Sequence, residues 1–159
     1  MTHIYMDMME DSLRKKIEVM QKIEKLNLRQ MEILEDQQHM DSDGFDDCVR
    51  QKGDLIDELT ILNDGFDSLF AKVGEEIEGH KEDYKEQIQR MQALIREITD
   101  LSNTLQVEEH KNKNLADYYF SSLRKEMKSG RQTAAAALNY HNIMNKAENV
   151  APQFFDNQG

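Results

Sequence analysis

The sequence holds little of what interrupts a helix or supports redox chemistry. Proline occurs once in 159 residues, at Pro152, tryptophan is absent, and the seven glycines are scattered. Because proline removes a backbone donor and clashes with the preceding turn, its absence from residues 1–151 permits very long helices. Cys48 is the single cysteine, which excludes a disulfide within the chain.

Long apolar runs and positive charge are also scarce. No stretch approaches the roughly 20 apolar residues that a transmembrane helix requires, and the N-terminal segment is acidic where a signal peptide needs basic residues. The net charge is -11 at pH 7, whereas nucleic acids and anionic membranes attract clustered Lys and Arg. We therefore expect a cytoplasmic protein that neither inserts into a membrane nor binds nucleic acid.

Charged and apolar residues are abundant, at 32% and 38% of the chain. This balance suits long helices that each bury one narrow stripe. The acidic excess lies in residues 1–127, which hold 29 acidic and 17 basic residues, against 2 and 3 in residues 128–159. We predict an all-α fold. An antiparallel bundle of three long coiled-coil-like helices would span residues 1–128, followed by a short C-terminal helix or flexible tail over 129–159.

The spacing of the apolar residues predicts where the long helices lie. A period near 3.6 residues predicts helices over about 8–39, 43–73 and 80–128. Asp41 is placed to cap the second helix, because its side chain can accept from the first free backbone N–H groups. The Asn63–Gly65 stretch is a turn signal, but the apolar spacing continues across it, so we expect a locally weakened helix there.

Polar residues interrupt the predicted stripes at three places. In the first helix the stripe passes through Leu28 and Met31 and slips once near Asn27. In the second helix Lys52 falls on the stripe, and we expect its stem to follow the seam while the ammonium reaches water. In the third helix residues 110–114 are polar. We interpret them as a solvated overhang, the alternative being a buried polar layer that fixes the helix register.

No group of residues has the spacing of a catalytic or metal site. Aligning Gly44 with the invariant glycine of a calcium loop puts His39 first and Arg50 twelfth, where calcium needs oxygen ligands. None of the five histidines follows a Glu by three residues, as carboxylate-bridged metal bundles require. Cys48 has no nearby His to activate it. We expect no catalytic residue, cofactor or bound metal, and therefore not an enzyme.

Apolar residues late in the chain are candidates for binding a partner. The C-terminal segment carries little charge but several large apolar side chains, a composition that often docks onto a partner helix or groove. We predict that the third helix and the segment 131–146 form the contact surface. Its candidate residues are Leu115, Tyr119, Leu123, Leu138, Tyr140 and Met144.

A known family shares several of these features. After an acidic turn, a helix carries a spaced lysine, an aliphatic pair and a leucine, and the late chain carries a Tyr/Asn element. The residues are Asp43 to Val49, Lys52, Leu55, Ile56, Leu59, the stretch Leu94 to Leu101, and Asn139 to Asn142. In this layout the chain resembles flagellar export chaperones of the FlgN type and, as near neighbours, of the FliT type.

The resemblance implies a specific function. Such a protein would be a cytosolic type III export chaperone that binds hook-filament junction (hook-associated) proteins, keeps them unassembled and delivers them to the flagellar export gate. It would be a monomer or small homo-oligomer that binds protein clients and a component of the gate. The alternative is a structural coiled-coil or scaffold protein that acts by self-association.

Overall fold

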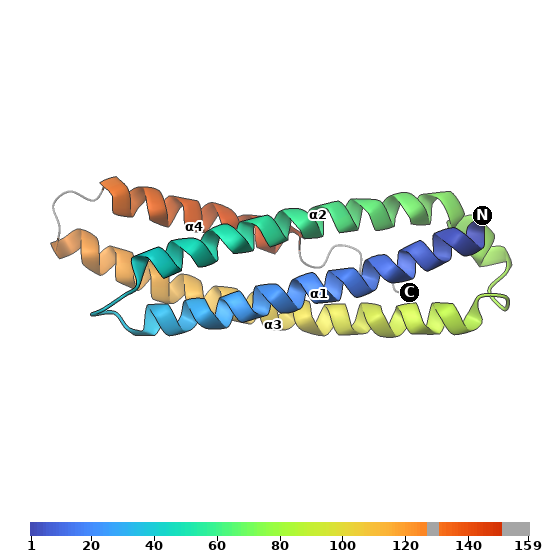
Figure 1. Ribbon diagram of the computed structural model, residues 1–159, viewed down its shortest axis with the longest axis horizontal. Coiled ribbons are helices and arrows are strands. Elements are labelled where there is room, and N and C mark those ends of the chain that lie inside the picture. Colours follow the sequence, from blue (N-terminus) through green and yellow to red (C-terminus); the bar gives the residue numbers. More distant parts are fainter. Residues whose placement is uncertain (127–130, 151–159) are drawn as a thin grey trace.

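The computed structural model describes residues 1–126 and 131–150, and this part of the chain contains four helices. They are α1 (Thr2–Glu35), α2 (Ser42–Gly79), α3 (Lys85–Glu126) and α4 (Arg131–Val150). Three long helices pack side by side and a shorter fourth lies against one half of them (Figure 1). The predicted all-α fold, with three long helices and a C-terminal helix, is confirmed.

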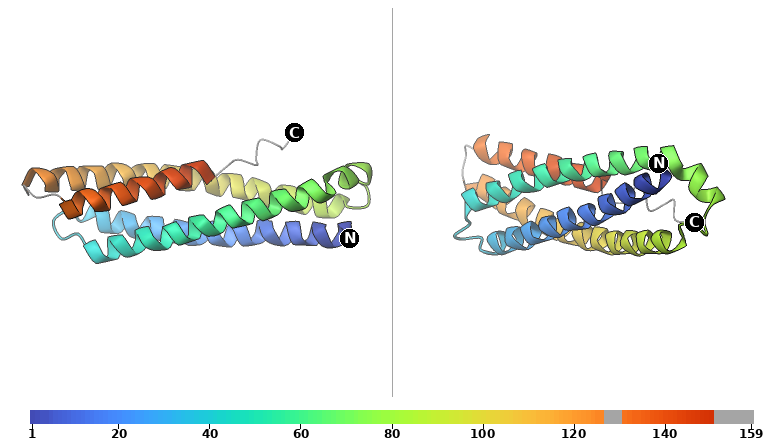
Figure 2. Two further views of the ribbon diagram at one scale, coloured as in Figure 1. Left: turned by 90° about the horizontal axis from the view of Figure 1, so that it is seen from above. Right: turned by 45° about the vertical axis from the view of Figure 1, so that its right-hand side comes forward.

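The helices do not contact one another equally. α1 packs closely against both α2 and α3, whereas the backbones of α2 and α3 come close to each other at very few points. α4 packs against α2 and α3, so it lies opposite α1 (Figure 2). At 1.5 Å per residue, the 20 residues of α4 reach about 30 Å and the 38 residues of α2 about 57 Å. The molecule is therefore a four-helix bundle at one end and a three-helix bundle at the other.

The first helix is shifted from the predicted range 8–39 towards the N-terminus. It begins at Thr2 because its first turns are part of the core, where Met6 and Met9 are buried. It ends at Glu35, and the following turn is stabilised by Asp36, whose carboxylate accepts a hydrogen bond from the backbone N–H of His39 at 3.2 Å. The prediction missed the start because Met8, at which we began the helix, lies on the exposed face.

The second helix begins as predicted and ends later. The Asp41 side chain accepts a hydrogen bond from the backbone N–H of Gly44 at 3.0 Å, which confirms the N-cap. The helix continues through Asn63–Gly65 without a break and ends at Gly79 instead of residue 73. A hydrogen-bonded turn then occupies residues 80–84, so the third helix starts five residues later than predicted.

The C-terminal helix is longer than expected from a short segment near residue 134. α4 spans Arg131–Val150, and its side chains over residues 137–146 pack on α2 and α3. The predicted flexible tail after residue 150 and the junction at 127–130 lie outside the described residues.

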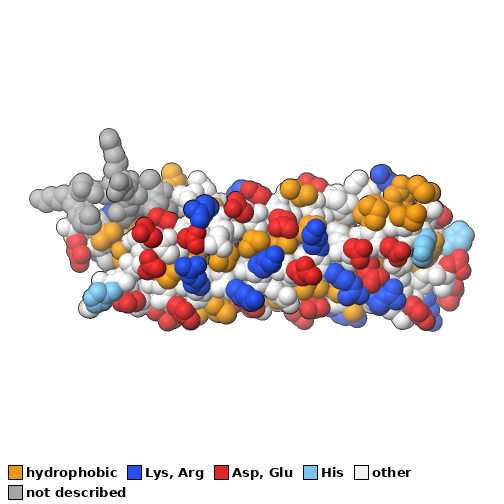
Figure 3. All heavy atoms as spheres, in the orientation of Figure 1, with side chains coloured by type: hydrophobic (Ala, Val, Ile, Leu, Met, Phe, Trp, Pro, Cys, Tyr) orange, Lys and Arg blue, Asp and Glu red, His pale blue; other side chains and the backbone are white. Residues whose placement is uncertain are grey.

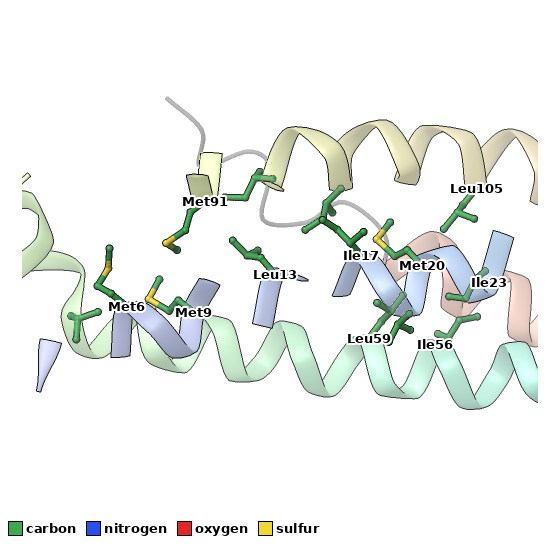
Figure 4. Close-up of a cluster of buried hydrophobic side chains, with 14 residues drawn as sticks. Met6, Met9, Leu13, Ile17, Met20, Ile23, Ile56, Leu59, Met91 and Leu105 are labelled. Carbon is green, nitrogen blue, oxygen red and sulfur yellow. The ribbon is translucent and has the colours of Figure 1, made fainter. Parts of the chain in front are cut away.

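Two apolar clusters form the core. The first, which we name the long cluster, extends from the three-helix end of the bundle, which we call the free end, to the middle of the bundle. Met6, Met9 and Met91 point toward one another within it (Figure 4). Its other buried members are Leu13, Ile17, Val19, Met20, Ile23, Ile56, Leu59, Val73, Ile95, Ile98 and Leu105. The second, the α4 cluster, consists of Leu34, Phe45, Val49, Ala116, Phe120, Tyr140 and Met144.

Candidate partner-binding surface and buried polar layer

A layer of polar side chains separates the two apolar clusters. On each long helix the chain passes from one cluster to the other through buried polar residues. These are Asn27 and Gln30 of α1, Lys52 of α2, and Glu109 and Asn112 of α3, which together we name the polar layer. The central core of the molecule is therefore polar although both flanking parts are apolar.

The Lys52 ammonium is the centre of this layer. Its Nζ lies 2.5 Å from Oε1 of Glu109 and donates to Oε1 of Gln30 at 2.9 Å. It also lies 5.8 Å from the centroid of the Tyr140 ring, within the range of a cation–π interaction. Because these partners belong to α3, α1 and α4, Lys52 of α2 contacts all the other helices.

A second pair of contacts joins α1 to α3 in the layer. The Asn112 amide donates to the backbone carbonyl of Asn27 at 2.9 Å, and the Asn27 amide donates to Oε1 of Glu108 at 3.2 Å. Burial raises the pKa of Glu108, against the lowering effect of this bond. These bonds connect the backbone carbonyl and the side-chain amide of Asn27 on α1 to two residues of α3 that lie one turn apart, so they constrain how the two parallel helices can slide.

The layer corrects two predictions. Lys52 is only 1% exposed, so its ammonium does not reach water. Burial lowers the pKa of Lys52, and the Glu109 carboxylate opposes this shift. The overhang interpretation of residues 110–114 is wrong at Asn112, which is buried under the four-helix half. The alternative of a buried polar layer is what the structure contains, because α4 and the start of α2 extend over this part of α3.

The predicted slip in the first stripe is also absent. A row of buried residues on α1 keeps alternating spacings of three and four through Asn27 and Gln30, while Leu28 is exposed and Met31 is half-buried. The row consists of Met6, Met9, Leu13, Lys16, Met20, Ile23, Asn27, Gln30 and Leu34, and Glu10, Ile17 and Val19 are buried beside it. This is the heptad spacing of a coiled-coil seam, and polar residues occupy it where we had moved the stripe onto nearby apolar ones.

The six predicted contact residues do not form one exposed surface. Tyr140 and Met144 are buried in the α4 cluster, and Leu115 and Tyr119 pack half-buried against it. The two remaining residues are Leu123, which is half-buried, and Leu138, which is 62% exposed. A partner could reach Tyr140 and Met144 only if α4 left its position.

A different apolar surface is accessible where α4 is missing. Residues seven apart on α2 lie on the same face of the helix. In the half of the bundle that α4 covers, Val49 and Ile56 of this face are buried. Further along, Phe70 on the same face is 54% exposed, and Ile77 is half-buried. Phe66 of α2 and Ile88 of α3 are likewise only half-buried against the long cluster. We name Phe66, Phe70, Ile77 and Ile88 the uncovered face.

Strong negative charge lies beside the uncovered face. Residues 57–79 of α2 hold seven acidic residues against one basic residue, Lys72. The acidic ones are Asp57, Glu58, Asp64, Asp67, Glu75, Glu76 and Glu78. In the covered half, Asp57 pairs with Lys146 of α4 at 2.8 Å, and Asp64 repeats that position seven residues later. A helix that packs on α2 as α4 does, but further along, would therefore lie beside carboxylates of α2.

A separate apolar patch occupies the free end of the bundle. Met1, Ile4 and Met8 lie three and four residues apart, so they share one side of α1, and all three are exposed. Figure 3 shows hydrophobic side chains gathered at this end, where the start of α1 meets the last third of α2. Met8 belongs to this exposed patch, whereas the neighbouring Met6 and Met9 are core residues.

Two other kinds of site were looked for among the described residues, a metal-binding group and a membrane-spanning helix, and the chain was compared with known proteins. Within residues 1–126 and 131–150 no three His, Cys, Asp or Glu side chains are grouped to hold a metal ion, and no helix could cross a membrane. Cys48 is buried, and burial raises the pKa of its thiol, which lowers its reactivity. No family model, curated protein or solved structure matches the chain.

Proposed function

We propose that the chain is a non-catalytic binding protein that holds an amphipathic helix of a client protein against the uncovered face. The observation that supports this most is the length of α4, which fills the space between α2 and α3 over only half of the bundle. A client helix would continue where α4 ends and bury Phe66, Phe70 and Ile88. Helix-in-groove binding of this kind depends on a single apolar stripe.

The charges indicate which helices would fit. α4 presents Lys146 to Asp57 while its apolar side faces the core. A client helix in line with it would meet Asp64 and Asp67 at the corresponding flank. We therefore propose a client helix with an apolar stripe and Lys or Arg beside it. The acidic surface would speed its association at low salt.

The resemblance to FlgN-type and FliT-type chaperones gives the proposal its biological form. In that form the client is a hook-filament junction protein, whose aggregation-prone helical end is covered in the cytoplasm until delivery to the export gate. The chain would act as a monomer or small homo-oligomer and would need no cofactor. An open apolar stripe on an acidic bundle is compatible with this role, because the stripe binds the client and the charge keeps the complex dispersed.

The test is binding of purified hook-filament junction proteins to matched surface variants. We expect Phe70→Ser and Ile88→Ser each to weaken binding about tenfold or more, as for central interface residues. Ile61→Ser is the control, since Ile61 is 70% exposed on α2 but lies on its outer side. Leu138→Ser examines the α4 surface predicted from the sequence. Circular dichroism confirms that each variant folds.

Each outcome separates the parts of the proposal. Equal binding by all variants would exclude the uncovered face, and loss only with Leu138→Ser would favour the predicted α4 surface. If basic amphipathic peptides bind but hook-filament junction proteins do not, the binding mode stands and the flagellar role fails.

The patch of Met1, Ile4 and Met8 favours a second candidate, a structural protein that self-associates through its ends. Three exposed apolar side chains on one helix face exceed the scattered singles of an ordinary surface. Sedimentation velocity distinguishes the two, because a chaperone without client stays a monomer or small oligomer. A scaffold would form larger species that Ile4→Ser disperses.

A further inference from the structure

The outer side of α1 carries positive charge that has no part in the uncovered face. Residues 14–29 hold six basic and two acidic residues, in a chain whose net charge is -11. Lys15, Lys22 and Arg29 follow one another at intervals of seven and so share one face of α1, with Lys25 beside them. All four are exposed, and Figure 3 shows Lys and Arg side chains along the middle of α1. We name these four residues the basic band.

The charges of the basic band are mostly unpaired. Arg29 lies 3.7 Å from Asp47 of α2, whereas the three lysines of the band form no ion pair or hydrogen bond with any described residue. Lys25 and Arg29 are four residues apart, and like charges at this spacing destabilise a helix. A ligand that neutralises the band would remove this repulsion. The free chain therefore contains a surface that an acidic ligand would stabilise.

An apolar groove of about 410 Å³ lies between α1 and α2 beside the basic band. It is lined by Lys22, Lys25, Leu26, Gln51, Asp54 and Leu55. Leu26 is half-buried but belongs to neither apolar cluster, whereas Leu55 also packs against the long cluster. Two leucines next to two ammonium groups can hold an apolar side chain of a ligand and the carboxylates that flank it.

The shape of this surface indicates the kind of ligand. Arg29 follows Lys15 by 14 residues, about 21 Å along the helix axis, so the band is longer than the groove and suits an elongated ligand. Asp54 is the one negative charge in the lining of the groove, and it would repel carboxylates on the α2 side. A flat anionic membrane would also meet the acidic surfaces around the band, whereas a single helix would contact the band alone.

We propose that the basic band and its groove bind an acidic amphipathic helix of a second protein partner. The partner helix lies along α1, with an apolar side chain in the groove and its carboxylates at seven-residue intervals against the band. This surface shares no residue with the uncovered face, for which we propose a client helix with basic residues. The chain would then hold two proteins of opposite charge on different faces, and binding of one would not require the other.

Fluorescence anisotropy of a labelled synthetic helix, titrated with the full chain, tests the proposal. The probe repeats Leu and Glu every seven residues over three heptads, and a control probe has the same composition in scrambled order. We expect Lys22→Glu with Lys25→Glu to weaken binding about tenfold or more, because like charges would then face each other. Lys111→Glu with Lys125→Glu makes the same charge change at two exposed lysines of α3, and should weaken binding by about twofold at most.

Single variants separate the groove from charge alone. Leu26→Ser keeps the net charge and should weaken binding about fivefold or more, whereas Asp54→Asn should strengthen it about twofold or more. Phe70→Ser should leave it unchanged, and circular dichroism confirms that each variant folds. Equal weakening by the two lysine pairs, equal binding of the scrambled probe, or no binding of the probe would overturn the proposal. So would binding to anionic vesicles, but not to the probe, that the change at Lys22 and Lys25 abolishes.

Discussion

The two halves of the bundle use the same helices and similar side chains with different results. Each half contains a phenylalanine on the inner side of α2, Phe45 in one and Phe70 in the other, and each contains a buried lysine. In the covered half Phe45 is buried against α4, and Lys52 has a carboxylate partner from α3. In the uncovered half Phe70 is exposed, and Lys16 reaches a neutral amide. α4 covers Phe45 but does not reach Phe70, and this accounts for the difference in exposure between the two phenylalanines.

The largest effect is expected where α4 closes the core. Phe45 contacts Phe120 and Tyr140 with ring centroids 5.7 and 5.5 Å away. Phe45→Ala should lower the free energy of unfolding by about 3–5 kcal/mol, the usual cost of an internal Phe→Ala change. Phe70→Ala should cost less than about 1 kcal/mol, because its side chain is already half in water. Urea titration measures both; equal losses would mean that the two halves are closed to the same degree.

Sequence alone predicted the class of fold because periodicity and the lack of proline act locally. The Asp41 cap followed from its chemistry, and the continuity of α2 across Asn63 followed from spacing. The length of α4 could not be predicted, since its stability derives from contacts of Tyr140 and Met144 with α2 and α3. Short helices are marginal alone, so only tertiary packing decides where such a segment ends.

The polar layer was missed for a different reason. Assigning stripes by hydrophobicity moved the seam from Asn27 to Leu28, although a strict seven-residue spacing connects Asn27 to Met20 and Leu34. The same spacing connects Glu109 to Ser102 and Ala116 on α3. A stripe assigned by strict seven-residue spacing, with polar residues allowed on it, would have located the layer residues of α1 and α3. It would not have paired Lys52 with Glu109, because that contact depends on how α2 and α3 meet.

An intermediate effect is expected at Lys16, the buried lysine of the uncovered half. Its Nζ donates to Oδ1 of Asn63 at 2.6 Å, and burial lowers its pKa to about 7, with Asp67 opposing the shift. The ordinary value is 10.5, so between pH 7 and 10.5 the unfolded chain binds more protons than the folded one. Stability should therefore rise with pH over this window. Lys16→Met should raise stability at pH 7 by about 1 kcal/mol and reduce that rise, because the pKa of Lys52 is also lowered and contributes in the same direction.

Urea titrations at pH 7 and pH 9 compare the parent, Lys16→Met and the control Lys15→Met. Lys15 is exposed on the same helix, so its replacement should change neither stability nor the pH dependence. Measurements stay at or below pH 9, because ionisation of Cys48, and at higher pH of tyrosine, in the unfolded chain acts in the opposite direction. A loss of stability in Lys16→Met, with no pH dependence in the parent, would mean that the contacts of the Lys16 ammonium outweigh the cost of burying it.

The smallest effect concerns the exposed ion pair at the end of the covered half. Lys146 and Asp57 lie 2.8 Å apart, with side chains 53% and 61% exposed, so water and salt screen their attraction. A double-mutant cycle of Lys146→Ala with Asp57→Asn should give a coupling energy below about 0.5 kcal/mol that disappears in 1 M salt. The same cycle with Asp64→Asn should give none, because α4 ends before that level. Coupling between Lys146 and Asp64 would instead place α4 one heptad further along α2, and the face that we describe as uncovered would then be shorter by two turns.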